Sequence, residues 1–474
     1  MRPGSVPGAG RIHLVLVPGF GGFDVLGGLE YYAGTTQRFQ RWLEGVGAVG
    51  PASSLHYFGN FPTAGVKTRA ALLREFLAKR VARNQIEPRD SIVLVGHSTG
   101  GLDIRQLLCD LTGMGPLDAR ISTSVDGSRE SALELASVRL RQMIRRVVFL
   151  SVPQRGTNIA NWVRDHGGAR RLITGLVRSV VDVADLPGIE GVDVGLAKWV
   201  TRPLLEQAER PCGLVAALSD VQLEMAERKS VDPLRAAKGR VAQGNVSLWL
   251  NHIAGDFLAI EDLAFGEDER GTPARFTSAQ RAREQQAWLA NERWGPIEVQ
   301  SFATLGRCPF GGRWKERRGD APRGLVDKAL AAVKGSFEGA LALLDAEEQQ
   351  GKSDLAYRLA YQICAQGPFE VAPDTSVEEL GSGRSVVLEP WENDGIVNTA
   401  SMYWPLGKNY LVHADHGDII GHFEFVKAGA RDLGREYHTY DIFESSSARD
   451  GVEFGKAEFA AVWDRVFDFA ALGR

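Results

Sequence analysis

The chain has 474 residues, of which 44% are hydrophobic and 24% charged, and its formal net charge is −4. This composition is that of a globular protein, and the small net charge gives no indication of a nucleic-acid partner. No apolar run is long enough to span a membrane, and no signal-type segment is visible near the first residue, so we expect a cytoplasmic protein unless a leader was removed. Neither a disulfide framework nor a zinc site is predicted, because no C-x-x-C pair occurs among the four cysteines, Cys109, Cys212, Cys308 and Cys364.

Strands and helices alternate through the first part of the chain. The first predicted strand is 11–17, followed by the Gly-rich loop 18–23. A helix is predicted over 66–83, where apolar residues recur at helical spacing. Strands are predicted over 91–96 and 145–151, which are continuous apolar runs. This alternation predicts an α/β fold, with a mostly parallel sheet and helices on both faces.

The pattern changes between about 157 and 384. Amphipathic helical stretches predominate there, at 160–182, 201–229, 276–292, 324–347 and 354–365. One apolar strand, 297–304, interrupts them, and an amphipathic helix over 456–472 follows the last strands. We therefore predict a core formed by 1–156 and 385–474, with 157–384 as a mainly helical cap that contains this one core strand.

One segment carries a specific signal for chemistry. Gly96-His97-Ser98-Thr99-Gly100 follows an apolar strand and precedes a helical pattern. This is the context of a G-x-S-x-G nucleophile elbow, in which a strained turn exposes the serine hydroxyl and glycines avoid collisions. Ser98 is therefore the candidate nucleophile, the alternative being an ordinary Gly/Ser turn. We interpret His97 as a structural residue that points away from the site.

A serine nucleophile needs a base, a carboxylate that orients the base, and donors for the oxyanion. In hydrolases with such an elbow, the acid and then the histidine follow the serine in the sequence. Asp394, in Asn393-Asp394-Gly395 after an apolar segment, suits an acid at the end of a strand, and the alternative is an Asx turn. The histidines late enough in the chain are His413, His416, His422 and His438.

Several segments resemble the bacterial true lipases of the α/β-hydrolase superfamily, especially the thermoalkaliphilic and staphylococcal type. The matching segments keep the family's order: 18–22 resembles its oxyanion loop, 96–101 its elbow, 151–157 the turn before its lid, 301–304 a strand, 393–402 its acid loop and 415–421 its histidine loop. The resemblance implies an α/β-hydrolase fold with a large helical cap or lid.

The same resemblance implies roles for individual residues. Ser98 would be the nucleophile, Asp394 the acid and His416 the base, because only His416 among its rivals is preceded by Asp and followed two residues later by a carboxylate. The backbone N–H groups of Phe20 and Thr99 would form the oxyanion hole.

The sequence departs from that family at three points. Pro18 stands where those lipases have a histidine, and no counterpart of their zinc site is visible. Asp418 matches the position of a calcium ligand, but a second carboxylate is replaced around Phe423. A structural calcium ion at Asp418 is one interpretation, and a carboxylate that hydrogen-bonds to the histidine loop is the other. We expect no cofactor to be required for catalysis.

The leading expectation is a serine carboxylic ester hydrolase, a lipase or esterase, that forms an acyl-enzyme on Ser98 with a small-molecule or lipid ester. The same residues would serve an acyltransferase, thioesterase or amidase, and a silent hydrolase-fold binding protein is the alternative from another class. Phe20 and Phe23 would either line an acyl pocket or serve packing. An apolar helical face would form either a mobile lid or ordinary cap core, and its members are Leu172, Ile173, Leu176, Val177, Val180 and Val181.

Overall fold

The computed structural model describes most of the chain up to residue 165, most of the chain from residue 375, and the strand at 297–308 with a few shorter pieces between these two parts. The described residues are 10–20, 25–26, 29–46, 53–60, 64–112, 135–136, 138–165, 262–263, 285, 297–308, 360–361, 363–365, 375–423 and 454–472. The apolar face expected at 172–181, Phe23, His438 and most of the predicted cap helices lie outside the described residues.

An eight-stranded sheet forms the centre of the molecule, with the strand order β4-β1-β5-β6-β7-β10-β8-β9. Neighbouring strands in this sheet are parallel except for the hairpin of β8 and β9. The strands are β1 Ile12–Val17, β4 Ser53–Tyr57, β5 Ser91–His97, β6 Ile144–Leu150, β7 Glu298–Leu305, β8 Ser376–Glu379, β9 Ser385–Val387 and β10 Lys408–His413. A separate small hairpin consists of β2 Val25–Leu26 and β3 Leu29–Glu30.

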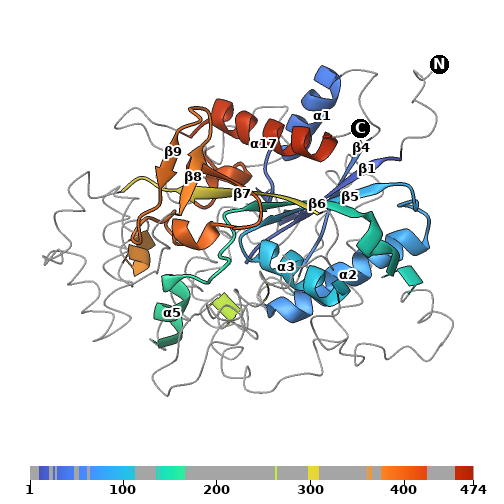
Figure 1. Ribbon diagram of the computed structural model, residues 1–474, viewed down its shortest axis with the longest axis horizontal. Coiled ribbons are helices and arrows are strands. Elements are labelled where there is room, and N and C mark those ends of the chain that lie inside the picture. Colours follow the sequence, from blue (N-terminus) through green and yellow to red (C-terminus); the bar gives the residue numbers. More distant parts are fainter. Residues whose placement is uncertain are drawn as a thin grey trace, which may run out of the picture.

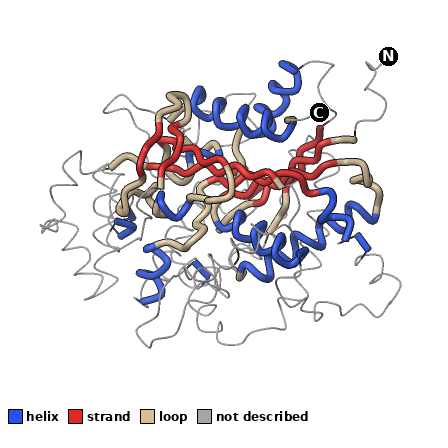
Figure 2. The backbone as a smooth tube through the Cα atoms, viewed as in Figure 1, coloured by secondary structure: helices blue, strands red, loops and turns tan. Residues whose placement is uncertain are grey.

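Helices cover both faces of the sheet, which Figure 2 shows as a continuous layer of strands between helices. One face is covered by α1 and α17, and the other by α2 and α3, with α5 on the same side as α2 and α3 (Figure 1). The bounds are α1 Thr35–Val46, α2 Val66–Ala82, α3 Thr99–Thr112, α5 Asn158–Asp165 and α17 Lys456–Ala471. Two 3-10 turns, η4 Thr399–Met402 and η5 Asp418–Ile420, lie in the loops near the sheet.

The apolar strands explain this layering, because alternate side chains of β5 face opposite helix layers. Ile92 and Leu94 belong to the core beneath α2 and α3, whereas Val93 and Val95 belong to the core beneath α1 and α17. All four side chains are 0% exposed. A strand buried on both faces needs such a continuous apolar run, which is the pattern that the sequence shows.

The predicted elements of the core are confirmed with small shifts at their ends. The helix expected over 66–83 is α2, and the strand expected over 297–304 is β7, which lies within the sheet between β6 and β10. The helix expected over 456–472 is α17. One difference concerns β8, which pairs with β10 and thus lies in the sheet, so the sheet resumes before the expected boundary at 385. Its short polar sequence, Ser-Val-Glu-Glu, gives no apolar run to find.

The parallel strands place their carboxyl ends along one edge of the sheet. The oxyanion loop follows β1 and the elbow follows β5, while the histidine loop follows β10. A separate core beneath the β8–β9 hairpin supports the acid loop, and its members include Val377, Leu388, Val397, Met402 and Leu411. The fold therefore brings every segment of the expected site to one edge, which is where ligands bind in open α/β sheets.

Candidate active site

The turn after β5 has the backbone geometry of a nucleophile elbow. Ser98 adopts a positive φ of 53°, its N–H donates to the Leu150 carbonyl at 2.9 Å, and α3 begins at the next residue. A Cβ at Gly100 would lie 2.3 Å from the Val17 carbonyl oxygen. A non-glycine residue with positive φ costs free energy and persists only where its surroundings enforce it. The tight glycine contact with β1 and the strained serine together distinguish this turn from an ordinary Gly/Ser turn.

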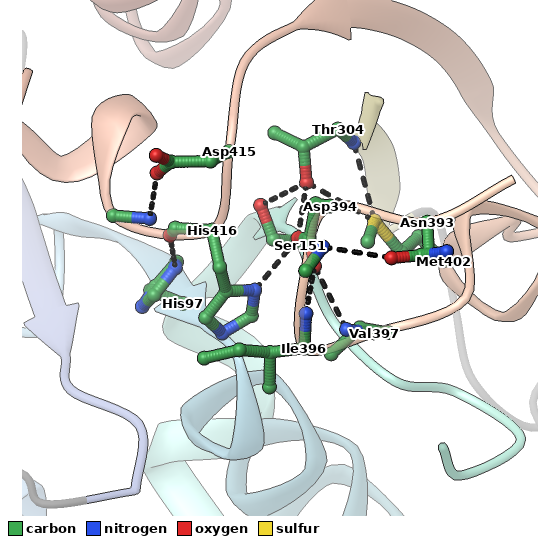
Figure 3. A network of polar contacts seen from close by, with 12 residues as sticks. His97, Ser151, Thr304, Asn393, Asp394, Ile396, Val397, Met402, Asp415 and His416 are labelled. Carbon is green, nitrogen blue, oxygen red and sulfur yellow. Dashed lines mark hydrogen bonds and ion pairs between the residues drawn. The ribbon is translucent and has the colours of Figure 1, made fainter. Parts of the chain in front are cut away.

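The acid loop and the histidine loop meet through a short side-chain contact. His416 Nδ1 lies 2.7 Å from Asp394 Oδ2, and the His416 N–H donates to the Asp394 carbonyl at 3.1 Å (Figure 3). The Asp394 side chain is fully buried and the His416 side chain is 8% exposed. A buried carboxylate on Nδ1 holds the imidazole so that Nε2 is the nitrogen left for chemistry.

The Asp394 carboxylate accepts four hydrogen bonds. Oδ1 accepts the N–H groups of Ile396 at 3.0 Å and Val397 at 2.8 Å, while Oδ2 accepts His416 Nδ1 and the Thr304 hydroxyl, the latter at 2.6 Å. The bonds to Oδ1 form the Asx-type turn that the sequence suggested as an alternative. The two interpretations are therefore compatible, because one oxygen shapes the loop while the other faces the histidine.

Thr304 and Ser151 complete this network, and the sequence did not single them out for it. Thr304 lies near the end of β7, and its hydroxyl is 2.8 Å from Ser151 Oγ at the end of β6 (Figure 3). Ser151 also has a positive φ, of 51°. The Thr304 hydroxyl is placed to donate to Asp394 Oδ2 and to Ser151 Oγ, and its single proton is directed to the carboxylate because a charged acceptor forms the stronger hydrogen bond. The sequence signal that could have identified Thr304 is a polar residue at the buried end of an apolar strand.

The rival histidines have other partners. His413 Nε2 is 2.9 Å from Glu379 Oε1 in the partly exposed β8–β9 region, and His422 Nε2 donates to the Tyr31 carbonyl at 3.1 Å. The expectation that His97 points away from the site is wrong. Its ring centroid lies 4.7 Å from that of His416, and its Nε2 is 3.0 Å from the His416 carbonyl oxygen, because the loop after β10 folds over the end of β5.

The expected oxyanion donors lie on either side of Ser98. Phe20 belongs to the loop after β1, and Thr99 is the first residue of α3. A Cβ at Gly19 would lie 2.6 Å from Ser98 Cβ, so this loop packs directly against the elbow. Among the described residues, neither the Phe20 nor the Thr99 N–H has a backbone acceptor. Two such N–H groups beside a serine are the donors that an oxyanion hole requires.

A buried ion pair fixes the first turn of α3. Arg69 Nη2 donates to the Thr99 hydroxyl at 2.6 Å and to Asp103 Oδ2 at 2.8 Å, and both charged side chains are fully buried. Burial raises the pKa of Asp103 to about 7, against the lowering effect of the Arg69 charge. The guanidinium thus holds the Thr99 side chain. The Thr99 N–H is the first N–H of α3, a position that has no acceptor within the helix.

Asp418 is engaged in the histidine loop. Its Oδ2 accepts the Asp415 N–H at 2.9 Å, and Asp415 Oδ1 accepts the N–H groups of Gly417 and Asp418 in return. Within the part of the chain that the structure describes, no group of three or more His, Cys, Asp or Glu side chains is arranged to hold a metal ion. Asp418 thus stabilises the histidine loop, as one interpretation expected, and a calcium ion at this residue stays a prediction.

The sheet order, the helices on both faces and the elbow after β5 define an α/β-hydrolase fold. None of the described helices combines the length and the apolar character needed to cross a bilayer. No protein-family model matches this chain, and no curated protein matches it in sequence.

Solved structures of esterases and lipases are similar to this chain at low identity. EstA from Clostridium botulinum is 17% identical with a TM-score of 0.40, and the match covers 93% of this chain and 88% of that one. Lipase 1 from Pelosinus fermentans is 15% identical with a TM-score of 0.43, covering 87% and 94%. A metagenomic carboxyl esterase is 13% identical with a TM-score of 0.37, covering 99% and 77%. Values this low leave the reaction to be argued from the site itself.

Proposed function

We propose that this protein is a serine carboxylic ester hydrolase of the lipase or esterase type, with Ser98 as nucleophile, His416 as base and Asp394 as the orienting acid. The observation that carries the proposal is the 2.7 Å contact between His416 and the buried Asp394 carboxylate, at the same sheet edge as a serine held at positive φ. The resemblance of several sequence segments to bacterial true lipases supports the same assignment.

In the proposed reaction, Ser98 Oγ attacks the ester carbonyl carbon and His416 Nε2 takes the hydroxyl proton. The backbone N–H groups of Phe20 and Thr99 stabilise the negative charge that develops on the carbonyl oxygen. The tetrahedral intermediate collapses, and the alcohol leaves with the proton from His416. Water then attacks the acyl-enzyme, with His416 again as base, and releases the acid and free Ser98.

Each of these steps uses a side chain or a backbone N–H of this chain. We assign a small-molecule or lipid ester as the substrate class from the resemblance to lipases, because the nucleophile and the oxyanion donors act on the acyl carbonyl and do not select the leaving group. An acyltransferase, thioesterase or amidase would use the same three residues, so a rate comparison on an ester, a thioester and an amide of one acyl group separates these activities.

The test is hydrolysis of p-nitrophenyl esters, from acetate to palmitate, by the wild type and by Ser98→Ala, with and without EDTA. We expect ester cleavage by the wild type, loss of turnover in Ser98→Ala and no effect of EDTA. The chain length that is cleaved fastest assigns the enzyme as esterase or lipase. Absence of turnover on every ester and on the thioester and amide would overturn the proposal, and EDTA sensitivity would indicate a metal ion near Asp418.

A further inference from the structure

A continuous path of hydrogen bonds joins three segments of the candidate site. The Gly19 N–H donates to Tyr31 Oη at 2.8 Å, and Tyr31 Oη lies 2.7 Å from His97 Nδ1. His97 Nε2 lies 3.0 Å from the carbonyl oxygen of His416. The path therefore runs from the oxyanion loop through the residue before Ser98 to the backbone of the candidate base.

Only one assignment of protons satisfies all three contacts. The His416 carbonyl oxygen is an acceptor only, so His97 Nε2 must carry a proton and donate it. Burial, and secondly the nearby His416, lower the pKa of His97 well below its ordinary value, so the ring is neutral and Nδ1 carries no proton. Nδ1 then accepts the Tyr31 hydroxyl proton, and Tyr31 Oη accepts the Gly19 N–H. Each donor points toward the next acceptor along the path.

The path is buried and closely packed. Tyr31 is 7% exposed and His97 is 2% exposed. A Cβ at Gly19 would lie 2.8 Å from the Tyr31 hydroxyl and 2.6 Å from Ser98 Cβ, so the Gly19 backbone is enclosed between them. Because Gly19 directly precedes Phe20, fixing the Gly19 N–H constrains the orientation of the Phe20 N–H, which is the proposed oxyanion donor.

We propose that Tyr31 and His97 are positioning residues that hold the oxyanion loop and the backbone of His416 in one arrangement around Ser98. The inference rests on the proposed function, since it assigns these residues to the same reaction. Both residues act through the hydrogen bonds of the path, and the His97 ring also lies beside the His416 ring. Their effect is to keep the Phe20 N–H and His416 in fixed positions relative to Ser98. Such positioning matters most when charge develops in the transition state.

Tyr31→Phe tests the inference, with Tyr32→Phe as the matched control. Tyr32 is the neighbouring buried tyrosine, and its hydroxyl donates to the Val17 carbonyl at 2.7 Å and contacts the His97 backbone rather than the His97 ring. Active enzyme is counted by titration with a fluorophosphonate that labels the nucleophilic serine, so that loss of folded protein is separated from loss of rate. The readouts are kcat per labelled site, KM, and the inhibition constant of a boronic acid, whose tetrahedral adduct occupies the oxyanion hole.

We expect Tyr31→Phe to lower kcat per site by about 10- to 100-fold with little change in KM, as misplacement of a catalytic group does. The boronic acid should bind more weakly by the same factor as kcat/KM falls, because both depend on the oxyanion donors. Tyr32→Phe, which leaves the contacts from Gly19 to Tyr31 and from Tyr31 to the His97 ring intact, should change both values much less. His97→Gln, which retains a donor for the His416 carbonyl, should recover much of the activity that His97→Leu loses.

Equal kcat per site and equal boronic acid inhibition in Tyr31→Phe and Tyr32→Phe would overturn the inference while leaving the proposed function intact, because the wild type would still be active. Equal activity of His97→Gln and His97→Leu would overturn the part assigned to His97. A wild type that neither turns over esters nor takes the fluorophosphonate label would overturn the proposed function, and the inference with it.

Discussion

The sheet carries two clusters of a serine, a histidine and an aspartate, one at each end of its strands. At the carboxyl ends, His416 contacts Asp394 and lies beside the elbow that holds Ser98. At the opposite end, His13 Nε2 is 3.0 Å from Asp90 Oδ2, and His13 Nδ1 is 2.8 Å from Ser54 Oγ. Residue types and distances alone therefore do not separate a candidate catalytic site from a structural cluster.

The backbone separates them. Ser54 lies within β4, opposite His13 in the register of the ladder, whereas Ser98 lies in a turn at positive φ. A second histidine, His56, lies 2.9 Å from the same His13 nitrogen that faces Ser54. A serine in a regular strand has no elbow to expose its hydroxyl and no helix N-terminus beside it. The turn after β5, rather than the triplet of side chains, therefore distinguishes Ser98 as the proposed nucleophile.

The largest expected effect follows from Asp394→Asn. In the variant, the N–H groups of Ile396 and Val397 hold the amide oxygen, so the amide NH2 faces His416 Nδ1. An NH2 group only donates, so the imidazole loses the tautomer that leaves Nε2 as base. We expect kcat to fall about 10,000-fold, as for other triads that lose their carboxylate. Steady-state kinetics on the preferred ester measure this, and a thermal unfolding curve verifies that the variant is folded. An unchanged kcat would remove Asp394 from the proposed mechanism.

A smaller loss of activity is expected for Thr304→Val. The substitution removes one hydrogen bond to a buried carboxylate, which contributes about 1.5–3 kcal/mol, so kcat should fall about 10- to 100-fold. The matched control is Thr399→Val, since the fully buried Thr399 donates its hydroxyl to the Thr304 carbonyl at 2.8 Å and not to Asp394. Equal losses in the two variants would show that Thr304 acts through packing alone.

The cluster at the other end of the sheet should affect stability rather than rate. Burial lowers the pKa of His56 to about 3, and secondly the Arg80 charge lowers it further, while the pKa of His13 is lowered by burial. An unfolded histidine titrates at about 6.5, so below that pH the unfolded chain binds more protons and stability falls.

His56→Gln removes one of these groups. Between pH 6 and 4 it should make the unfolding free energy less dependent on pH, by up to about 1.4 kcal/mol per pH unit, the value for one proton. Urea unfolding of the wild type and the variant at several pH values measures the two slopes. Parallel slopes would show that His56 is already protonated in the folded protein.

The smallest effect is expected for Ser54→Ala, which should leave ester hydrolysis unchanged because Ser54 lacks the elbow. Mass spectrometry after fluorophosphonate treatment should place the label on the peptide that contains Ser98 in the wild type and in Ser54→Ala. Label on Ser54 in the Ser98→Ala protein would contradict the comparison, since it would show that the second cluster also activates its serine.

Much of the core could be predicted from the sequence because its signals are local. The apolar run of β5 and the glycines around Ser98 describe a buried strand and a sharp turn within one short segment. The structure also brings Asp394 and His416 together, as the motif resemblance led us to expect. These features could be predicted because each is encoded by residues adjacent in the sequence, or by the order of motifs that the fold requires.

The supporting residues could not be predicted, because their partners are distant in sequence. Tyr31 reaches His97, and Thr304 reaches Asp394, through tertiary packing that no local pattern encodes. The ion pair of Arg69 and Asp103 forms only because α2 and α3 pack together, so the burial of neither residue could be predicted from its own helix. The error over His97 has the same origin, since the loop that covers it follows β10.

Two hydrogen bonds of Asn393 have a consequence for the evolution of this chain. The Gly306 N–H donates to the Asn393 carbonyl at 3.0 Å, and Asn393 Nδ2 donates to the Tyr361 carbonyl at 3.2 Å, so one residue of the acid loop holds both ends of the segment between Gly306 and Tyr361. Doubling the length of a loop whose ends are already joined adds only about 0.6 kcal/mol of closure entropy. Exchange of the segment between Gly306 and Tyr361 by recombination, even for one of very different length, would therefore leave the sheet and the candidate site in place.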